Sequence, residues 1–383
     1  MKKRKIVVTT GTRAEYGILR SILDEIKNSK KLELQLIVTG SHLSKKHGFT
    51  VNEIKKNGYK IDAKINMVPK INSEFESTKI LGNAIVSFSK IFRRLNPDMN
   101  LILGDRDEML ASAIAAYHMN IPNAHIHGGD KSGGLDEYAR HAITKLSNIH
   151  FAATKKSAKR ILQMGEKAQY IFHVGSPSID EILKNKITKK TELEKKYKIK
   201  IMGNEILLLQ HPVTTELNEI EMQITQTLNA ITKLKKTTIV IGSNLDSRND
   251  IIYKNILKFA TKYNFIKFYP TLPRNDYLGF LKNCGVLVGN SSSGIIEASF
   301  FKKPVVNIGI RQKNRERGKN VIDVNTNSKN AVYQTIQKAL KMKKSKKSTF
   351  DLTFGKGNSA QKIVTHLENV SLGKYLIQKE LMY

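Results

Sequence analysis

The sequence has little cysteine and no tryptophan. Among its 383 residues there is one cysteine, Cys284, which excludes an internal disulfide framework and a cysteine-rich zinc site. One unpaired thiol also favours a reducing compartment. Long apolar runs are missing too: the run behind the basic amino terminus stops after Val8, whereas a membrane-spanning helix needs about 20 apolar residues. We therefore expect a soluble, cytoplasmic protein.

Acidic residues are scarce relative to basic ones. Asp and Glu number 33 against 65 Lys and Arg, which gives a formal net charge of +32. Such a surplus is compatible with nucleic acid, anionic lipid or a phosphorylated small molecule as partner. The lysines, however, are spread through segments such as KITKKTELEKKYKIK and KMKKSKKS, without interleaved aromatic stacking residues. We interpret the excess as a solvated surface and expect neither nucleic acid nor a membrane as partner.

Short β-branched runs alternate with amphipathic segments along the chain. KIVVTT precedes a segment in which Ile18, Leu19, Ile22, Leu23 and Ile26 share one helical face. The rhythm recurs at LELQLIVTG, NLILGD, NAHIHG, IHFAAT and YIFHVG, and then at EILLLQH, TTIVIGS, FIKFYP, GVLVGN and PVVNIG. Strands that alternate with helices predict parallel sheets covered on both faces.

A charged, glycine-ended stretch separates the two series of predicted strands and indicates a linker. The sequence therefore predicts an α/β protein with two Rossmann-like, doubly wound parallel-sheet domains. We expect an N-terminal domain over residues 1–185 and a C-terminal, nucleotide-binding domain over 186–368. Whether residues 369–383 form a helix that packs back on the first domain stays open.

Polar residues gather where the predicted strands end, which is where ligands bind in such sheets. In the first half these segments are GTRAEYG, GDRDE and HIHGGD, and in the second QHPVTTE, SNLDSRND with Asn244, NSSSGIIE and IGIRQKNRERG. A ligand held between two such domains would contact both sets of loops. No P-loop, GxGxxG, GxSxG or HExxH pattern occurs, which disfavours the commonest NTPase, dehydrogenase, serine hydrolase and zincin chemistries.

The stretch VLVGNSSSGIIEA runs from a predicted strand into a predicted helix. One serine suffices to cap a helix, whereas Ser291, Ser292, Ser293 and Gly294 together supply three hydroxyls and successive free amides. Such a junction suits a diphosphate. Glu297, one turn further on, would accept hydrogen bonds from a ribose, because its charge would repel phosphate. Capping alone is the alternative interpretation.

Other strand-end residues also allow two interpretations. Arg13 and Arg311 could pair with phosphate oxygens or lie on the surface. His125 and His127 are two residues apart on a strand, but a third metal ligand with clear spacing is missing. We place His125 in the strand interior, His127 and His211 in the ligand cleft, and expect no metal.

Taken together, GTRAEYG, GDRDE, HIHGGD, LDEYARHAITKLSNIHFAAT, GSPSID, QHP, NSSSGIIEASFFKKPVVNIGIRQ and RERG resemble the UDP-N-acetylglucosamine 2-epimerase family, most closely its hydrolysing branch. That branch feeds sialic acid and legionaminic acid synthesis. The resemblance runs roughly from Lys5 to the 360s, with the motifs in family order. It implies a GT-B-like fold with UDP in the interdomain cleft, a homodimer or homotetramer, and no metal or other cofactor.

The resemblance also implies an activity: UDP-N-acetylglucosamine loses UDP by elimination, and water then adds to release N-acetylmannosamine. By motif position, the catalytic candidates are Asp105, Asp136 and His211, and Arg106 is a substrate-contacting candidate. The nucleotide-binding candidates are Arg13, Ser291, Ser292, Glu297 and Arg311. Arg140 and His141 lie in the matching RHAITK segment without an assigned role.

One candidate departs from the family pattern. His127 stands where the animal enzymes and the non-hydrolysing branch hold a glutamate thought to act in acid/base catalysis. An imidazole can also transfer protons near neutral pH, so we retain His127 as a catalytic candidate, and the division of labour among the four candidates stays open. The subgroup with HIHGGD acts on UDP-N-acetylglucosamine or on UDP-N,N′-diacetylbacillosamine. A GT-B glycosyltransferase is a further alternative.

Overall fold

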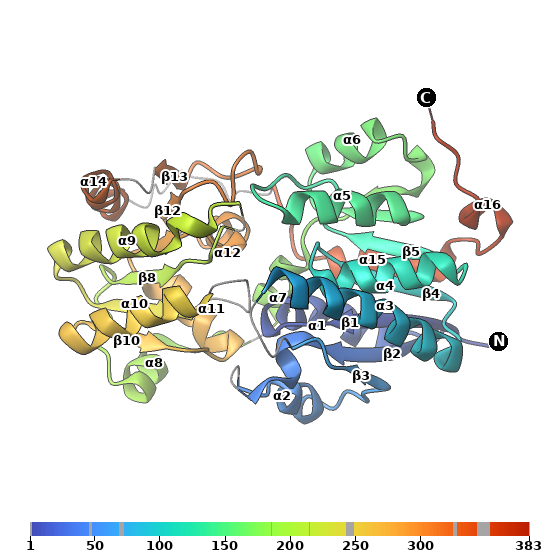
Figure 1. Cartoon of the computed structure of the whole chain (residues 1–383), viewed down its shortest axis with the longest axis horizontal. Helices are drawn as coiled ribbons and strands as arrows, with labels where there is room; N and C mark the ends of the chain where they lie inside the picture. The colour runs from blue at the N-terminus through green and yellow to red at the C-terminus, as the bar shows by residue number, and fades with distance from the viewer. Residues whose placement is uncertain are drawn as a thin grey trace. The chain divides into compact units, whose positions relative to one another are not determined.

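The computed structural model describes residues 2–45, 48–68, 73–184, 186–213, 215–242, 249–324, 328–342 and 353–382. The chain divides into two compact units (Figure 1). Unit 1 comprises Met1–Asp130, Asp136–Lys184 and Phe354–Tyr383. Unit 2 comprises Lys131–Leu135 and Asn185–Thr353.

Unit 1 contains a seven-stranded parallel sheet in the order β3-β2-β1-β4-β5-β6-β7. Its strands are β1 (Arg4–Thr10), β2 (Leu32–Thr39), β3 (Ala63–Ile65), β4 (Met99–Leu103), β5 (Asn123–Ile126), β6 (Ile149–Ala152) and β7 (Ile171–His173). Its helices are α1 (Arg13–Asn28), η1 (Gly40–Leu43), α2 (Val51–Lys56), α3 (Glu74–Leu95), α4 (Asp107–His118), α5 (Asp136–Leu146), α6 (Lys155–Gln163), η3 (Ala168–Tyr170), α7 (Pro177–Lys184), α15 (Ser359–Asn369) and α16 (Lys374–Ile377).

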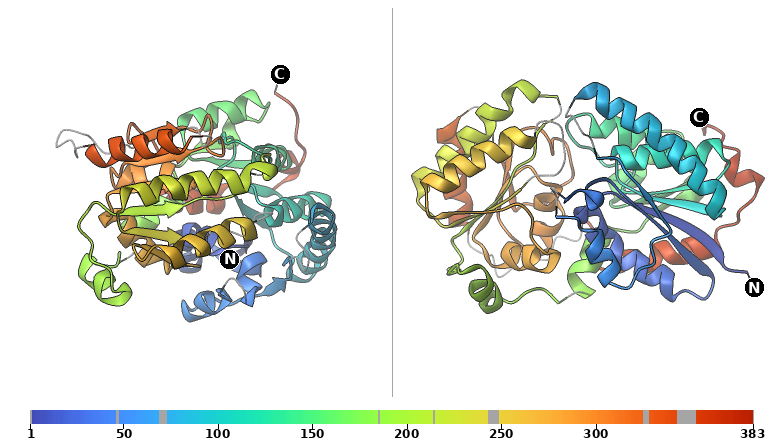
Figure 2. Two further views of the ribbon diagram at one scale, coloured as in Figure 1. Left: turned by 60° about the vertical axis from the view of Figure 1, so that its left-hand side comes forward. Right: turned by 60° about the horizontal axis from the view of Figure 1, so that its bottom comes forward.

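Helices cover both faces of this sheet, and strand β1 shows how its residues are shared between them (Figure 2). Ile6 and Val8 belong to the core under α1 and α15, whereas Val7 belongs to the core under α3 and α4. This alternation follows from the two-residue period of a strand. Because both faces are buried, the middle of the strand, Ile6 to Val8, is a continuous apolar run, as is typical of parallel sheets.

Helix α1 shows how local sequence sets the start of an element. Thr12 accepts a hydrogen bond from the Glu15 amide (3.2 Å), and the Glu15 carboxylate accepts one from the Thr12 amide (2.9 Å). This reciprocal pair is a capping box. The predicted apolar face is confirmed, because Leu19, Ile22 and Leu23 are fully buried in the core.

Unit 2 contains a six-stranded parallel sheet in the order β10-β9-β8-β11-β12-β13. Its strands are β8 (Ile206–Leu209), β9 (Thr238–Ile241), β10 (Ile266–Tyr269), β11 (Val286–Gly289), β12 (Val305–Ile308) and β13 (Val321–Val324). Its helices are α8 (Lys190–Tyr197), η4 (Leu217–Glu219), α9 (Ile220–Leu234), α10 (Asn249–Lys262), α11 (Arg274–Asn283), α12 (Ser292–Ile295), α13 (Glu297–Phe300) and α14 (Lys329–Lys341). Apolar residues of α9, α10 and α14 pack against its strands in one continuous core.

The predicted fold class is confirmed: both units are doubly wound α/β sheets in which strand order reverses next to the first strand of the unit. The strands β3 and β13, at the sheet edges, were not predicted. They are short or only half-buried, so their apolar signal is weak.

The return of the chain to unit 1 occurs at Phe354, earlier than the predicted position 369. Helix α15 packs on α1 and α7, with Ile363 and Leu367 in the core of unit 1. The buried carboxylate of Asp180 accepts hydrogen bonds from the Ser359 and Ala360 amides, both at 3.1 Å. A buried helix start held by a charged acceptor therefore ties the carboxyl-terminal segment to unit 1. No helix within the described ranges combines the length and apolar character needed to cross a bilayer.

Candidate functional site

The turn after β5 in unit 1 holds His127, Gly128, Gly129 and Asp130. His127 has a left-handed backbone (φ 65°), and its amide donates to the Phe151 carbonyl at 3.1 Å. At Gly129, where φ is 71°, a Cβ would lie 2.5 Å from the Ser157 carbonyl oxygen. Left-handed backbone at a non-glycine residue is strained and is often kept for function. The glycines let the chain reverse tightly, which brings Asp130 back to His127.

The His127 imidazole lies between a carboxylate and a hydroxyl. Its Nδ1 is 3.1 Å from Asp130 Oδ2 and its Nε2 is 3.0 Å from Ser176 Oγ. Ser157 Oγ donates to the other Asp130 oxygen at 2.6 Å. All four side chains are buried. A histidine held in this way is equipped to accept and release a proton.

Arg140 links two of the strand ends in unit 1. Its guanidinium forms an ion pair with Asp105, which follows β4, and also donates to the Asp130 carbonyl at 2.9 Å. Sequence reasoning left Arg140 without a role. The signal available there was its position in DEYARH, one helical turn after Asp136. The structure thus brings Asp105 and the turn with His127 to one buried cation.

Two carboxylates lie close together at the starts of α1 and α4, Glu15 after β1 and Glu108 after β4. Glu15 is buried and accepts hydrogen bonds from the Gly11 (3.0 Å) and Thr12 amides. Burial, together with the nearby Glu108 carboxylate, raises the pKa of Glu15 to about 7. Arg106 lies between the two, 3.3 Å from Glu108 and 4.0 Å from Glu15. Arg106 therefore balances a pair of like charges in this structure.

Arg13 and Asp136 lie elsewhere in unit 1. Arg13 forms an ion pair with Glu53 of α2 at 2.7 Å. Asp136 is the first residue of α5 and is half-buried. The preceding segment, Lys131–Leu135, belongs to unit 2, where the Gly133 amide donates to the Arg311 carbonyl at 2.9 Å. A Cβ at Gly133 would lie 2.0 Å from the Ile310 carbonyl oxygen, so only glycine permits this approach.

In unit 2, Asn290 connects three strand-end segments. Its side chain accepts from the His211 amide (2.7 Å) and donates to the His211 carbonyl (2.9 Å). Its own carbonyl accepts from Arg311 (3.2 Å) and from Gln312 (3.1 Å). Asn290 therefore brings His211, Arg311 and the serine segment together, a role that sequence reasoning missed although Asn290 stands in GNSSSG.

The serine segment differs from the single helix that we predicted. Two four-residue helices, α12 and α13, follow Ser291, and they meet at Ile296. Ser291 is the N-cap and accepts from the Ser293 amide at 3.4 Å. Ser291, Ser292 and Ser293 are half-buried at the end of β11, and Gly294 is buried below them. Three hydroxyls thus stand at one strand end, although the helix behind them is short.

Glu297 is held by side chains of its own unit. It forms an ion pair with Arg274 and accepts a hydrogen bond from Ser293 Oγ. Tyr277 also bonds to Ser293 Oγ, and burial raises the pKa of the Tyr277 phenol. Each carboxylate oxygen has two lone pairs, so these bonds leave acceptor capacity on Glu297. The predicted binding residue Asn244 lies outside the described residues.

The prediction that His125 lies in the interior of a strand is confirmed. It is fully buried, with Nε2 2.7 Å from the Gly104 carbonyl oxygen and Nδ1 3.2 Å from Thr144 Oγ1. Burial lowers its pKa to about 3, which keeps this core imidazole neutral. Within the described ranges, no cluster of three or more His, Cys, Asp or Glu side chains could hold a metal ion.

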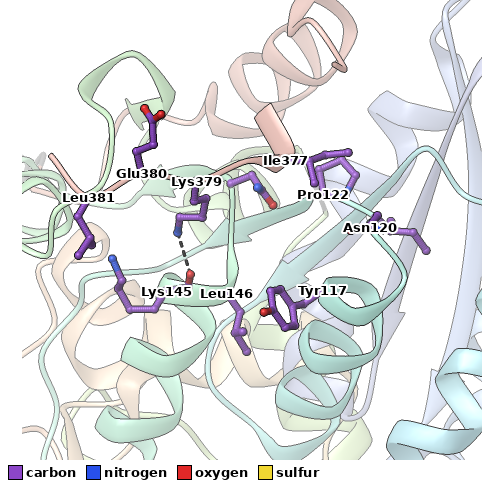
Figure 3. A pocket seen from close by; sticks show the side chains of 11 residues that line it. Tyr117, Asn120, Pro122, Lys145, Leu146, Ile377, Lys379, Glu380 and Leu381 are labelled. Atoms are coloured by element: carbon purple, nitrogen blue, oxygen red, sulfur yellow. Dashed lines mark hydrogen bonds between the residues drawn. The ribbon is translucent and has the colours of Figure 1, made fainter. Parts of the chain in front are cut away.

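A pocket of about 370 Å³ lies at the amino-terminal ends of the unit 1 strands, opposite the carboxyl ends that carry the candidate residues (Figure 3). Asn120 and Pro122 in its wall precede β5, and the carboxyl-terminal segment closes one side. Lys379 Nζ donates to the carbonyls of Lys145 (2.8 Å) and Ser147 (2.7 Å). The carboxyl-terminal segment therefore packs against unit 1 and forms one wall of the pocket. The pocket lies away from the candidate site residues.

Comparisons with known proteins agree with this fold. A family model described as UDP-N-acetylglucosamine 2-epimerase matches residues 24–368. The chain belongs to this family. Among relatives, the UDP-N,N′-diacetylbacillosamine 2-epimerase (hydrolyzing) of Legionella pneumophila is 38% identical over 98% of each chain. The UDP-N-acetylglucosamine 2-epimerase of Neisseria meningitidis is 35% identical over 89% of each chain.

A solved structure shares the fold of this family member. The crystal structure of a UDP-GlcNAc 2-epimerase from Neisseria meningitidis bound to UDP-GlcNAc has a TM-score of 0.80 and 20% identity, and the match covers 95% of this chain and 99% of that one. The GT-B-like fold is therefore confirmed. Membership and the identities together support a hydrolysing UDP-sugar 2-epimerase activity.

Proposed function

We propose that this protein is a hydrolysing 2-epimerase that converts a UDP-2-acetamido sugar and water into UDP and the free C2-epimeric sugar. The observation that carries the proposal is the buried array after β4 and β5, in which Asp105, Arg140, Asp130 and His127 are connected. Proton donors and acceptors at the carboxyl ends of parallel strands occupy the usual place for catalysis in this fold.

The reaction needs three kinds of groups. A base removes the proton at C2, the electron pair of that bond forms the C1–C2 double bond, and the C1–O bond breaks with its electrons on the phosphate oxygen of UDP. Cations stabilise that leaving group. Water then supplies a hydroxyl to C1, and an acid delivers a proton to the opposite face of C2. Proton transfer on both faces inverts C2 and leaves a free sugar.

The two units supply these groups by different means in our proposal. Asp105, His127, Asp136 and His211 are the candidates for proton transfer. The candidates for binding the diphosphate are Ser291, Ser292 and Arg311. Ser293, Gly294 and Asn244 are further candidates for binding the substrate. Glu297 is the candidate for binding the ribose. Arg13 and Arg106 add positive charge from unit 1. The diphosphate assignment rests on hydroxyl and guanidinium chemistry at strand ends of unit 2.

For the substrate we propose UDP-N,N′-diacetylbacillosamine in preference to UDP-N-acetylglucosamine. The relative named for the first substrate matches more of this chain at a higher identity than the relative named for the second. The two sugars differ at C4, where an acetamido group replaces a hydroxyl, and at C6, which lacks its hydroxyl. UDP-N-acetylglucosamine is the second candidate, because the difference in identity is small.

The test is incubation with each UDP-sugar separately in heavy water, followed by proton and phosphorus NMR. We expect UDP, a free 2-epimeric sugar with deuterium at C2, and a kcat/KM at least about tenfold higher for the diacetylated substrate, since one well-placed polar contact is worth about 1.5 kcal/mol. A product that retains UDP would indicate a non-hydrolysing epimerase. Sugar release only when an acceptor is added would indicate a glycosyltransferase.

A further inference from the structure

Asp130 and its partners determine which nitrogen of His127 carries a proton. We propose that Asp130 is a positioning residue that fixes His127 as the Nδ1–H tautomer and thereby makes Nε2 the proton-accepting atom of the site. The inference rests on the proposed function, in which His127 takes part in proton transfer.

The hydrogen-bond inventory around His127 allows one consistent arrangement. Asp130 Oδ1 already accepts from Ser157 Oγ, which orients the carboxylate so that Oδ2 faces Nδ1. A carboxylate only accepts, so Nδ1 carries the proton. Nε2 then has a lone pair, and the Ser176 hydroxyl donates to it. The Ser178 amide in turn points at Ser176 Oγ at 3.4 Å, which leaves the serine proton for the imidazole.

The backbone holds this arrangement by several independent bonds. Arg140 donates to the Asp130 carbonyl and Arg160 donates to the Gly129 carbonyl. The left-handed residue His127 and the glycines behind it complete the turn. Strain at such a position persists only where its surroundings determine it. The turn therefore costs free energy, and it places the carboxylate against Nδ1.

Other charges near the turn do not replace Asp130 as the direct partner of the imidazole. Asp105 is paired with Arg140, and Arg140 and Arg160 are bonded to backbone carbonyls of the turn. The neighbouring His125 and His150 are kept neutral because burial lowers the pKa of both. The titratable and charged groups that the described contacts place near the turn include Asp105, Asp130, Arg140, Arg160, His125 and His150.

The proton balance follows from this arrangement. In the elimination step the Ser176 hydroxyl turns away from Nε2, and Nε2 takes the C2 proton. The imidazole becomes an imidazolium while the C1–O electrons leave with UDP. The Asp130 carboxylate stabilises the new positive charge without accepting the proton itself. The imidazolium returns its proton to solvent after the product forms. No oxidant, metal or further reactant is required.

Asp130→Asn tests the proposal, because it keeps the size of the side chain and removes its charge. An amide can donate to Nδ1 and would favour the opposite tautomer. We expect kcat to fall about 10²- to 10⁴-fold, with KM and the Kd for UDP within about threefold. Activity within threefold of the parent would overturn the proposal.

The matched control is Asp180→Asn, which makes the same change at another buried aspartate of unit 1. We expect it to lower thermal stability, because Asp180 holds the start of α15, while kcat stays within about threefold of the parent. A fall in kcat equal to that of Asp130→Asn would assign the loss to general destabilisation and overturn the specific role of Asp130.

A direct readout does not depend on turnover. Long-range proton–nitrogen NMR on protein labelled with ¹⁵N-histidine, with His127 assigned by a His127→Gln variant, reports the tautomer. We expect Nδ1–H in the parent and a change in Asp130→Asn. Nε2–H in the parent would overturn the inference. If the parent shows Nδ1–H but releases no epimeric sugar, the proposed function fails while the assignment of the tautomer stands.

Discussion

The turn after β5 in unit 1 and the serine segment after β11 in unit 2 solve different physical problems. The first buries an imidazole and a carboxylate of a strained, glycine-dependent turn against two hydroxyls from other segments. The second leaves three hydroxyls half-buried at a strand end and relies on Asn290 to hold its neighbours. Burial and strain suit groups whose protonation must be controlled. Accessible hydroxyls and guanidiniums suit a charged ligand that arrives from water.

In our proposal, the turn after β5 serves proton chemistry and the serine segment serves ligand affinity. Variants in the first region should change kcat with little change in UDP affinity, whereas variants in the second should change affinity or local stability. A variant that behaves in the opposite way would break the division.

The largest effect is expected for Asp105→Asn. We expect kcat to fall by about 10³-fold or more, equivalent to about 4 kcal/mol, because the change removes a candidate proton-transfer group and unpairs the buried Arg140. Calorimetric titration with UDP should give a Kd close to that of the parent. Full turnover in this variant would remove Asp105 from the mechanism. Lost UDP binding would contradict the claim that this region affects kcat and not UDP affinity.

Asn290→Ala should destabilise unit 2 by about 3 kcal/mol. The change leaves the buried His211 amide and carbonyl without their side-chain partner, and each such group costs about 1–3 kcal/mol. Urea unfolding measures the loss. The matched control is Asn307→Ala, a buried asparagine of the same unit with one side-chain bond to Asp323. If the control is destabilised as much as Asn290→Ala, the claim that Asn290 stabilises unit 2 by bridging its strand ends is contradicted.

The double variant Ser291→Ala with Ser292→Ala should weaken UDP binding about 30-fold, equivalent to about 2 kcal/mol for two hydrogen bonds to a charged group. Titration with UDP checks the affinity, and kcat at saturating substrate should change much less. The control is Ser328→Ala, which removes the N-cap of α14 in the same unit. Unchanged UDP affinity in the double variant would refute the phosphate assignment.

Glu15→Gln tests whether unit 1 holds a carboxylate poised near neutral pH. Because burial raises the pKa of Glu15 from 4.5 to about 7, the folded state binds its proton more tightly than the unfolded state does. The stability that Glu15 contributes is therefore present below pH 4.5 and lost as the pH rises through 7. The glutamine variant should gain about 1–2 kcal/mol relative to the parent between pH 5 and pH 8.

The comparison variant for that measurement is Glu166→Gln. Hydrogen bonds from His150, Lys145 and Lys379 outweigh burial and lower the pKa of Glu166 to about 2. Its stabilisation is present above pH 4.5 and lost as the pH falls through 2, which is the opposite sign. Unfolding midpoints at several pH values should separate the two variants. Parallel pH dependences would contradict the assignment for Glu15.

Much of the fold could be predicted, because its signals are local. The apolar runs predicted the interior strands of both sheets, and the alternation of strands with helices predicted that the strands pair in parallel. Thr12 and Glu15 stand at capping-box spacing, so the start of α1 is visible in the sequence. The edge strands and the return at Phe354 were missed, because a half-buried edge and a docked tail depend on partners far along the chain.

The candidate site was predicted in part. Asp105, His127, His211 and Arg311 stand directly after strands, and motif position singled them out. Asp130, Arg140, Ser176 and Asn290 were missed as contributors, since each acts through a partner between 3 and 79 residues away. Asp130 is close in sequence, yet its contact with His127 depends on a left-handed backbone that composition does not reveal.

The sequence by itself determined the kinds of chemistry available to this protein. One cysteine, no long apolar run, and hydroxyls, guanidiniums and imidazoles after strands follow from composition and periodicity, which are local properties. Only the tertiary structure decided which of these groups meet. It places Ser157 and Ser176 from two separate strand–helix junctions against one His127–Asp130 pair, because parallel strands bring distant segments to the same edge of a sheet.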